Sequence, residues 1–279
     1  MNRHILYRMS WGSRWATGLF LCLMWMASPS TQAQVGFQVS PAKLYFQQKG
    51  NAVQTARMHL TNPTNTRLEL QATCADWRRD STGSKVYYAP GTLPGSCCAL
   101  LKITPSVIEL EPGEEKDVLV SISAEPKPAY GKIRNAMIFL TQSNEQELAR
   151  AKSSAPQLLI KMQIGVHVYL TPEGNSTPDI DITSMDVSKP AQQYQVKVQV
   201  QNKGEALVES QLRMEYLNLE TMEEVKAEPI AVNTMPQDKF KVVAEVPRNL
   251  SAGKYLIVAV LDSGPSQALK VAELETVLK

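Results

Sequence analysis

The stretch Leu158-Leu-Ile-Lys-Met-Gln-Ile-Gly-Val-His-Val-Tyr-Leu-Thr-Pro172 has an apolar residue at every second position. The apolar set is Leu158, Ile160, Met162, Ile164, Val166, Val168 and Leu170. The positions between them include Lys161, Gln163 and His167. A period of two residues is the pattern of an extended chain with one apolar face. The sequence therefore predicts a β-strand here.

This predicted strand is longer than one small domain needs. From Leu158 to Leu170 it would span about 43 Å at roughly 3.3 Å per residue, whereas a usual strand has only about 5–6 residues. Either the strand bends from one sheet into another, or part of its apolar face is meant for a partner.

The rest of the chain alternates in short segments that are separated by turn residues. Strands are predicted at 35–46 with a break at Ser40-Pro41, and at 53–61, 67–77, 85–88, 98–104, 108–110, 118–122, 133–140, 180–187, 194–200, 207–216, 240–246, 255–261 and 269–278. Many short strands with turn signals favour antiparallel β-sandwiches, and 279 residues fit two of them in tandem. We expect domains at 34–172 and 179–279, joined by a linker at 173–178.

The two predicted domains share a short order of elements. Each has an alternating strand, a turn at an asparagine and a return strand that is expected to pair with the first, at 59–70 and at 198–212. The segment 212–225 has some helical composition, but β-structure is the more consistent interpretation.

Residues 1–33 are predicted to be a cleaved signal peptide. Arg3, Arg8 and Arg14 form a basic region without acids, an apolar run follows at 15–26, and small residues stand before a cut placed after Ala33. The alternative is a membrane anchor, but the apolar run is shorter than the roughly 20 residues that a span needs. We expect an exported protein with no stable membrane span.

Removal of the leader also changes the charge. The chain has a formal net charge of +2, and the leader carries three arginines and no acid, which leaves 2 − 3 = −1 for the rest. The basic character belongs to the leader, so nothing favours a nucleic-acid partner.

Three cysteines follow the leader, namely Cys74, Cys97 and Cys98. In an exported chain we expect one disulfide, from Cys74 to either Cys97 or Cys98. Adjacent residues on a strand point to opposite faces, so only one of the two suits a given partner. The alternative is three buried, reduced cysteines. Only His59 and His167 remain as histidines, without ligand-like spacing, so no metal and no cofactor are expected.

Sequence motifs of the common enzyme classes are absent, including the nucleophile elbow, the phosphate-binding glycine loop and the zinc-binding helix motif. Asp76, beside Trp77 and near Asp80, is the nearest approach to a carboxylate cluster, and a solvated hairpin loop explains it better. Enzyme function is not expected.

Four pieces of the sequence together resemble the periplasmic chaperones of pilus and fimbrial assembly, the PapD-like family. They are the opening segment 37–46 with its basic residue Lys43, the turn Leu110-Glu-Pro-Gly113 before an alternating strand, the polar loop at 143–156, and the long strand closing in Pro172. The segment from Cys74 to Cys98 departs from the family pattern, so the chain resembles a divergent branch. The resemblance implies two immunoglobulin-like sandwiches and no catalysis.

In that family the long strand is lent to a subunit whose fold lacks one strand. By resemblance, the subunit-binding strand here would include Leu158, Ile160, Met162, Ile164 and Val166. The segment 158–162 is the expected lent portion, while 164–170 is expected to face the domain's own core. The alternative is that all seven apolar residues are core.

The family also holds the subunit's C-terminal carboxylate with two basic residues. Lys43 falls on the first position, and His167 stands where the family has lysine. Because a neutral imidazole anchors a carboxylate less well than an ammonium does, this departure weakens the expected site. The alternative is that His167 is an ordinary outward residue of the strand.

The expected function is that of a periplasmic chaperone for pilus, fimbrial or other surface subunits, with an outer-membrane usher as a further partner. The alternative is a structural module of the cell envelope that binds peptidoglycan or a surface protein.

Overall fold

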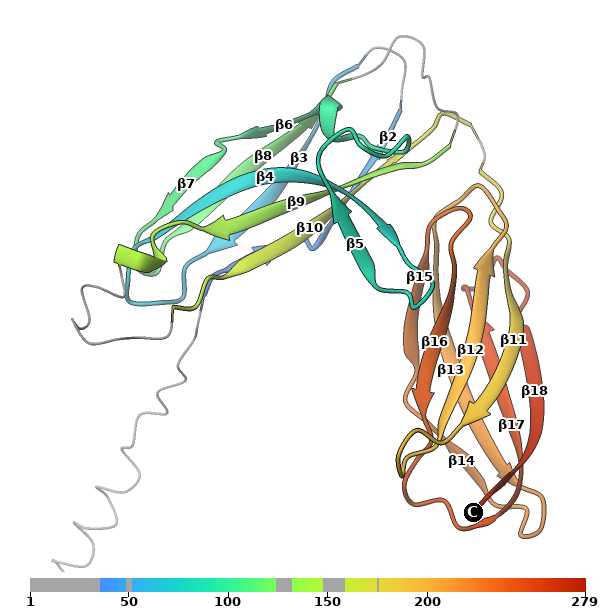
Figure 1. Cartoon of the computed structure of the whole chain (residues 1–279). Helices are drawn as coiled ribbons and strands as arrows, with labels where there is room; N and C mark the ends of the chain where they lie inside the picture. The colour runs from blue at the N-terminus through green and yellow to red at the C-terminus, as the bar shows by residue number, and fades with distance from the viewer. Residues whose placement is uncertain (1–35, 49–51, 124–131, 148–158, 175) are drawn as a thin grey trace, which may run out of the picture. The chain divides into compact units, whose positions relative to one another are not determined.

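The computed structural model, drawn in Figure 1, describes residues 36–48, 52–123, 132–147, 159–174 and 176–279. The expected signal peptide and Leu158 lie outside the described residues. In the part of the chain that is described, no helical segment has the length and apolarity needed to cross a bilayer.

The fold is all-β and consists of two sandwiches, as predicted. In the first sandwich one sheet has the order β1 (Gln38–Ser40), β3 (Gln54–Thr61), β8 (Glu115–Ile122), β6 (Leu101–Thr104). The facing sheet has the order β2 (Lys43–Gln47), β10 (Gln163–Thr171), β9 (Arg134–Gln142), β4 (Leu68–Arg79), β5 (Lys85–Tyr88), and β7 (Val107–Leu110) also pairs with β4. A short 3-10 helix, η1 (Cys98–Leu100), precedes β6.

The second sandwich has a smaller and a larger sheet. The smaller has the order β11 (Ile180–Ser188), β12 (Gln195–Asn202), β16 (Lys239–Glu245). The larger has the order β14 (Glu224–Lys226), β13 (Val208–Asn218), β17 (Gly253–Asp262), β18 (Lys270–Leu278), with β15 (Ile230–Thr234) also on β13. The expected domain boundaries at 172, 178 and 179 stay predictions.

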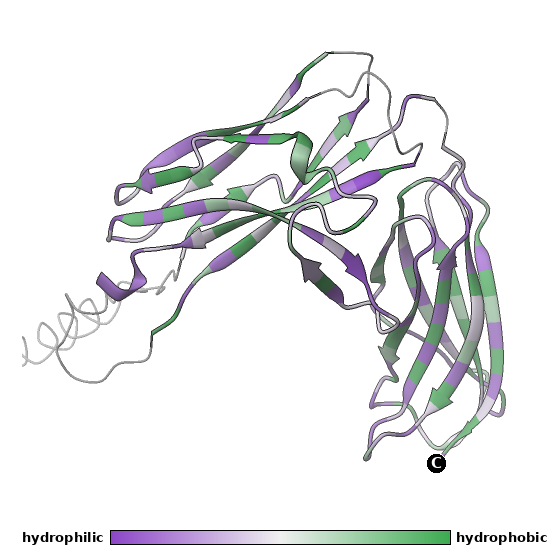
Figure 2. Cartoon of the chain, turned by 45° about the horizontal axis from the view of Figure 1, so that its top comes forward, coloured by the Kyte–Doolittle hydropathy of each residue, from purple (hydrophilic) through white to green (hydrophobic). Residues whose placement is uncertain are grey.

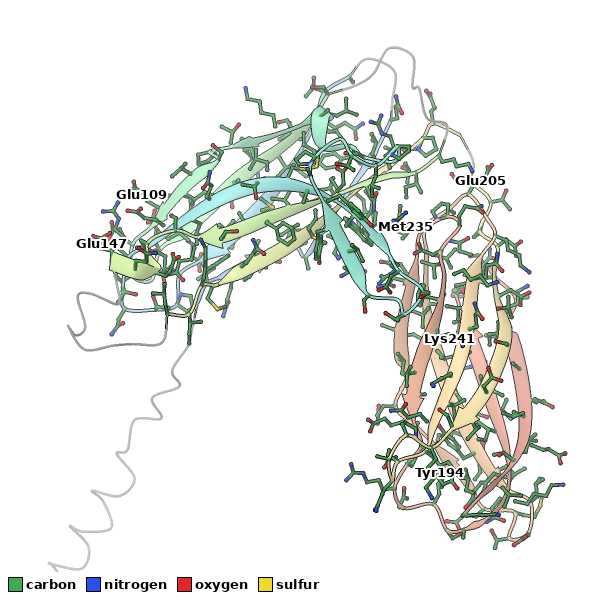
Figure 3. The ribbon with its side chains drawn as sticks, viewed as in Figure 1. Glu109, Glu147, Tyr194, Glu205, Met235 and Lys241 are labelled. Carbon is green, nitrogen blue, oxygen red and sulfur yellow. A yellow bond between two sulfur atoms is a disulfide. The ribbon has the colours of Figure 1, made fainter. Side chains whose placement is uncertain are left out.

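Alternation along the strands builds the two cores. In β12 and β13 every second side chain is buried, and Figure 2 shows the matching change between apolar and polar residues along the ribbons. One core lies between the sheets of the first sandwich and includes Leu60, Leu70 and Val120. The other lies within the second sandwich and includes Val198, Leu212 and Ile257. Tyr194, labelled in Figure 3, lies just before β12 and holds the residue that follows β18, since its hydroxyl accepts a hydrogen bond from the backbone amide of Lys279 (2.9 Å).

The break predicted at Ser40-Pro41 is a crossing between sheets. The peptide bond before Pro41 is cis, β1 pairs with β3 in one sheet, and β2 pairs with β10 in the other. Proline is tolerated here because it lies between the two ladders and removes no hydrogen bond from either.

The expected pairing of the return strands is wrong. β3 and β4 lie in facing sheets of the first sandwich, as do β12 and β13 in the second. The chain crosses between sheets at a fully buried asparagine in each case, Asn62 and Asn202.

The side chains of these two asparagines make corresponding hydrogen bonds. The side-chain amide of Asn62 donates hydrogen bonds to the backbone carbonyls of Thr66 (2.8 Å) and Leu110 (3.0 Å). The side-chain amide of Asn202 donates to the backbone carbonyls of Ala206 (2.9 Å) and Thr234 (3.4 Å). Each side-chain oxygen also accepts from the backbone two residues later. The shared order seen in the sequence is therefore a repeated sheet crossing that satisfies buried backbone carbonyls.

Two further expectations need correction, and one strand was not predicted. The strand predicted at 98–104 begins only at Leu101, because the chain first turns through η1. The strand predicted at 67–77 continues to Arg79, because Arg78 and Arg79 pair with β5. Strand β15 has no counterpart in the sequence-based prediction, whereas β-structure over 212–225 is confirmed.

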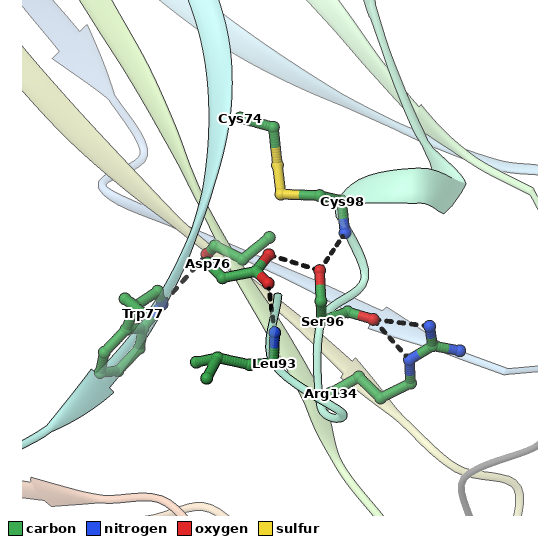
Figure 4. The surroundings of a disulfide bond; sticks show 8 residues. Cys74, Asp76, Trp77, Leu93, Ser96, Cys98 and Arg134 are labelled. Atoms are coloured by element: carbon green, nitrogen blue, oxygen red, sulfur yellow. Dashed lines mark hydrogen bonds between the residues drawn. A yellow bond between two sulfur atoms is a disulfide. The ribbon is translucent and has the colours of Figure 1, made fainter. Parts of the chain in front are cut away.

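The structure decides between the two disulfide alternatives. Cys74 on β4 is bonded to Cys98 of η1, with their Cα atoms 5.9 Å apart (Figure 4). Cys97 is a free thiol and fully buried. Burial raises the pKa of this thiol to about 12, so the thiolate is suppressed at neutral pH.

We predict that the Cys74–Cys98 bond raises the free energy of unfolding by about 3 kcal/mol, given the 24 residues that separate the two cysteines. Reductant should lower the denaturation midpoint of the wild type, and Cys98→Ala should remove this sensitivity. Cys97→Ala, which deletes the neighbouring sulfur, should keep it. Equal midpoints of the wild type with and without reductant would contradict the prediction.

Candidate functional site

The strand at the centre of the sequence analysis is shorter in the structure than predicted. β10 covers nine residues, Gln163–Thr171, and its antiparallel ladder with β9 ends where Gln163 faces Thr141. One more backbone bond joins the Gln142 amide to the Met162 carbonyl (2.9 Å). The described residues before Met162 are not part of a strand, because β9 ends at Gln142 and offers them no further ladder.

The two edges of β10 are unequally covered. On one side it pairs with β9 over almost its whole length. On the other, β2 pairs in parallel only with its second half, from His167 opposite Lys43 to Thr171 opposite Gln47 (Figure 1). Among the described residues no strand pairs with Gln163–Val166 on this second side. The first half of β10 therefore presents an open sheet edge.

Burial increases steadily along the alternating face of this segment. Ile160 is 57% exposed, Met162 and Ile164 are half-buried, and Val166 is fully buried. Met162 lies over Gly36, whose φ is +98°, and a Cβ at that glycine would be 2.8 Å from the Met162 methyl carbon. Of the expected binding residues, Ile160 is thus accessible, Met162 and Ile164 are partly so, and Val166 belongs to the core.

The two expected carboxylate anchors lie side by side, because Lys43 and His167 are partners in the β2–β10 register. Lys43 is already in contact with a carboxylate, that of Glu209 on β13. The Tyr45 hydroxyl donates to the same oxygen (3.0 Å). Partial burial alone would raise the pKa of Glu209, but the hydrogen bonds from Lys43 and Tyr45 lower it below the ordinary value. Glu209 is therefore an anion at neutral pH.

His167 is held on both ring nitrogens. The Lys85 ammonium, on β5, is 2.9 Å from Nε2, and the Tyr169 hydroxyl is 3.2 Å from Nδ1. The Trp77 ring contacts the imidazole edge-on, with centroids 4.9 Å apart. An ammonium can only donate, so Nε2 accepts and Nδ1 carries the proton toward Tyr169.

The surroundings of His167 disfavour its charged form. Burial lowers the pKa of His167 to about 4, helped by the positive charges of Lys85, Arg79 and Lys43. His167 is therefore a neutral imidazole at neutral pH. Its role as a cationic anchor, inferred from resemblance, has no support in its charge state.

Lys85 was not singled out in the sequence, although it lies closest to His167. The signal was present in the pairing of β4 with β5, which places Lys85 opposite Arg79, two residues beyond Trp77 on the same face. The strand predicted at 67–77 ended two residues before Arg79, so the register between Arg79 and Lys85 could not be derived from the sequence.

Asp76 is not the solvated loop residue that the sequence suggested. It lies on β4 and is 1% exposed. Its carboxylate accepts hydrogen bonds from the Leu93 amide (2.8 Å) and the Ser96 hydroxyl, and Ser96 in turn accepts from the Cys98 amide (3.2 Å), as Figure 4 shows. A buried carboxylate with these donors fastens the loop before η1 to β4. Its role is structural.

Within the ranges that the structure describes, no three histidine, cysteine or acidic side chains lie together in a way that could hold a metal ion. The expected absence of metal and cofactor stays a prediction.

We predict that the two histidines titrate in opposite directions. The hydrogen bond that the His59 ring donates to the Asp117 carboxylate raises the pKa of His59, whereas burial lowers the pKa of His167 to about 4. Side-chain NMR should show His59 titrating above the ordinary histidine value of 6.5 and His167 still neutral at pH 5. Titration of His167 near 6.5 would contradict the buried, cation-flanked environment.

The lowered pKa of His167 makes the stability of the fold depend on pH. Since the pKa of His167 is depressed, the unfolded chain binds its proton more readily, and stability is lost as the pH falls from about 6.5 toward 4. After allowance for solvent screening, we expect a loss of about 1–2 kcal/mol over this window. It should disappear in His167→Gln, measured by denaturant unfolding at several pH values, and persist in His59→Gln.

No protein-family model matches the sequence, and no curated protein matches it. Solved structures of similar fold exist. A chain of a complex titled "Chaperone-tip adhesin complex is vital for synergistic activation of CFA/I fimbriae biogenesis" has 12% identity and a TM-score of 0.45, with 87% of this chain and 98% of that chain covered.

Two further structures give similar values. For the CsuC–CsuE chaperone–tip adhesion subunit pre-assembly complex of Acinetobacter baumannii, the identity is 12%, the TM-score 0.48, and the coverage 85% of this chain and 97% of that chain. For the class 5 fimbriae chaperone CfaA, the identity is 13%, the TM-score 0.45, and the coverage 88% of this chain and 100% of that chain. Values this low do not transfer a function from those proteins to this chain.

Proposed function

We propose that this protein is a periplasmic chaperone that binds incompletely folded pilus, fimbrial or other surface subunits by lending them a β-strand. The observation that carries the proposal is the open edge of β10 at Gln163–Val166, preceded by the exposed apolar residues Leu159 and Ile160, of which Ile160 belongs to the alternating row. The proposed binding segment is 159–164, with Leu158 as its expected first residue.

An open edge of this kind favours a β-strand as its partner. The unpaired amide and carbonyl groups of the edge can form a ladder with an added strand, and alternate side chains can enter pockets of the partner. Each apolar side chain that becomes buried contributes about 1.5–3 kcal/mol. Ile160 and Met162 would extend the apolar row of β10 into the partner, while Val166 and Val168 stay in this domain's own core.

The accessible apolar segment also explains why a chaperone role suits the site better than a rigid scaffold role. Exposed edges with apolar side chains are hazards for aggregation and are tolerated where a partner covers them. The partner must supply the missing side of the ladder, which an incompletely folded sandwich domain lacking one strand can do. An outer-membrane usher as a second partner rests on the family resemblance alone.

A periplasmic location agrees with two features of the chain. The sequence predicts an exported protein through its leader, and the Cys74–Cys98 bond belongs to an oxidising compartment. Catalysis forms no part of the proposed function.

We predict that Ile160→Asp weakens capture of an incomplete fimbrial subunit by about 100-fold, because a carboxylate would replace a buried side chain in the shared ladder. The subunit, truncated so that one strand is missing, would be refolded with the protein. Complex formation would be followed by size-exclusion chromatography, and protection of the amides at 160–166 by hydrogen exchange.

Val107→Asp is the matched control, because Val107 is 59% exposed and lies on β7, away from the open edge. Leu159→Asp tests the alternation, since its side chain would point to the opposite face of the added ladder and its effect should be smaller. Equal capture by Ile160→Asp and Val107→Asp would overturn the proposed function.

A further inference from the structure

Gly165 lies in the open edge of β10 and has no side chain. In the β9–β10 register it stands opposite Phe139, and on its other side no described strand pairs with it. A glycine inside a strand weakens the strand and often marks a place where another backbone or side chain comes close. Since its neighbours in β10 all carry side chains, this glycine is the position of the open edge at which a partner could approach most closely.

The outer face of the sheet carries Gly165. Even-numbered residues of β10, such as Val166 and Val168, are fully buried and point into the core. Odd-numbered residues therefore point outward. The row that the proposed function lends to a partner includes Ile160 and Met162, which have even numbers and lie on the other face of the strand. A contact at Gly165 would thus be additional to the lent row.

Two side chains of β9 take the space beside Gly165. A Cβ at this glycine would be 2.8 Å from the Met137 sulfur and 3.3 Å from Cε1 of the Phe139 ring. Met137 is 2% exposed, whereas Phe139 is half-buried. The Tyr87 ring packs edge-on against the Phe139 ring, with centroids 5.0 Å apart. The outer face next to the open edge is therefore apolar, with the Phe139 ring as its accessible part.

The backbone of Gly165 also points toward the open side. Along a strand, successive residues direct their amide and carbonyl groups to alternate sides. The His167 amide donates to the carbonyl of Ala42, just before β2 (3.0 Å). The groups of Gly165, two residues earlier, therefore point to the same side, where no described strand meets them. A strand added at the open edge would bond to Gly165 and place one of its own residues directly opposite.

The side chain of that opposite residue must share the outer face, because directly paired residues of a sheet point to the same side. With no side chain at Gly165, it can reach across to the Phe139 ring. The outer neighbours on β9 and β10 carry no charge, since Gln163 donates to the Thr141 hydroxyl (2.8 Å) and His167 is neutral. An uncharged aromatic ring fits best, because aromatic rings pair favourably and can compensate for a glycine on the neighbouring strand.

We propose that the outer face at Gly165 is a subsite for one aromatic side chain of the polypeptide strand that pairs with the open edge of β10. This inference rests on the proposed strand-lending function and adds a feature by which partners are distinguished. Phe139 provides the contact surface, and Gly165 provides access to it. A strand without an aromatic ring at this register would still pair with the edge, but more weakly.

A series of synthetic peptides tests this subsite. The host peptide alternates valine and threonine and has charged ends for solubility. In each guest peptide phenylalanine replaces a different threonine, so that every register is sampled. Affinities for the protein would be measured by calorimetry. The methyl NMR signal of Met137, assigned with Met137→Leu, reports where the ring lies, because a nearby aromatic ring shifts it.

We expect one guest peptide to bind about fivefold more tightly than the host and to shift the Met137 methyl signal. Phe139→Thr should abolish this gain and leave host binding unchanged. Phe139→Leu, which keeps an apolar side chain but loses the ring, should lower the gain. Gly165→Ala should also lower it, because its Cβ would displace the Met137 sulfur. Leu119→Thr is the matched control, since Leu119 is 40% exposed on β8, in the other sheet.

The possible failures are distinguishable. Equal affinity of the wild type for host and guest peptides, or a gain that survives Phe139→Thr, would overturn the subsite and leave strand pairing intact. If the wild type binds none of the peptides, the subsite is also overturned, and capture by Ile160→Asp against its control decides strand lending separately. A Met137 signal that shifts with protein concentration in the absence of peptide would identify a second copy of the chain as the occupant and overturn the assignment to a partner strand.

Discussion

The parallel pairing of β2 with the second half of β10 is the constraint on which the candidate site depends. It begins at the His167–Lys43 pair and covers one side of β10 from there to Thr171. By the same geometry it leaves Gln163–Val166 open on that side. The pairing therefore sets the length of the free edge and places the imidazole beside Lys43.

The group of cations around His167 depends on a second element, the hairpin of β4 and β5. Its base is fastened by the Cys74–Cys98 bond and by the buried Asp76 carboxylate, which together tie the segment after the hairpin back to β4. Lys85 reaches His167 because this hairpin continues β4 past Trp77. The hairpin is thus the element that supplies the cation in contact with His167.

The sequence predicted local structure well where burial alternates and poorly where a side chain's role depends on a distant strand. The strand periods, the proline break and a disulfide from Cys74 to one of the two cysteines Cys97 and Cys98 were predicted from the sequence, and the structure selects Cys98. The predicted pairing of β3 with β4 was wrong. A turn at an asparagine has the same sequence pattern whether it closes a hairpin or carries the chain from one sheet to the other. Asp76 was misjudged because its donors, Leu93 and Ser96, lie far along the chain.

By itself, the sequence determined the all-β class, the tandem arrangement and the alternating row from Ile160 to Leu170, because period-two burial is a property of neighbouring residues. Only the tertiary structure decided where that row stops being core, because this depends on how far β9 and β2 extend beside β10. It also decided the charge of His167. An imidazole's pKa is set by burial and by the cations around it, and Lys85, Arg79 and Lys43 meet there only in the folded chain.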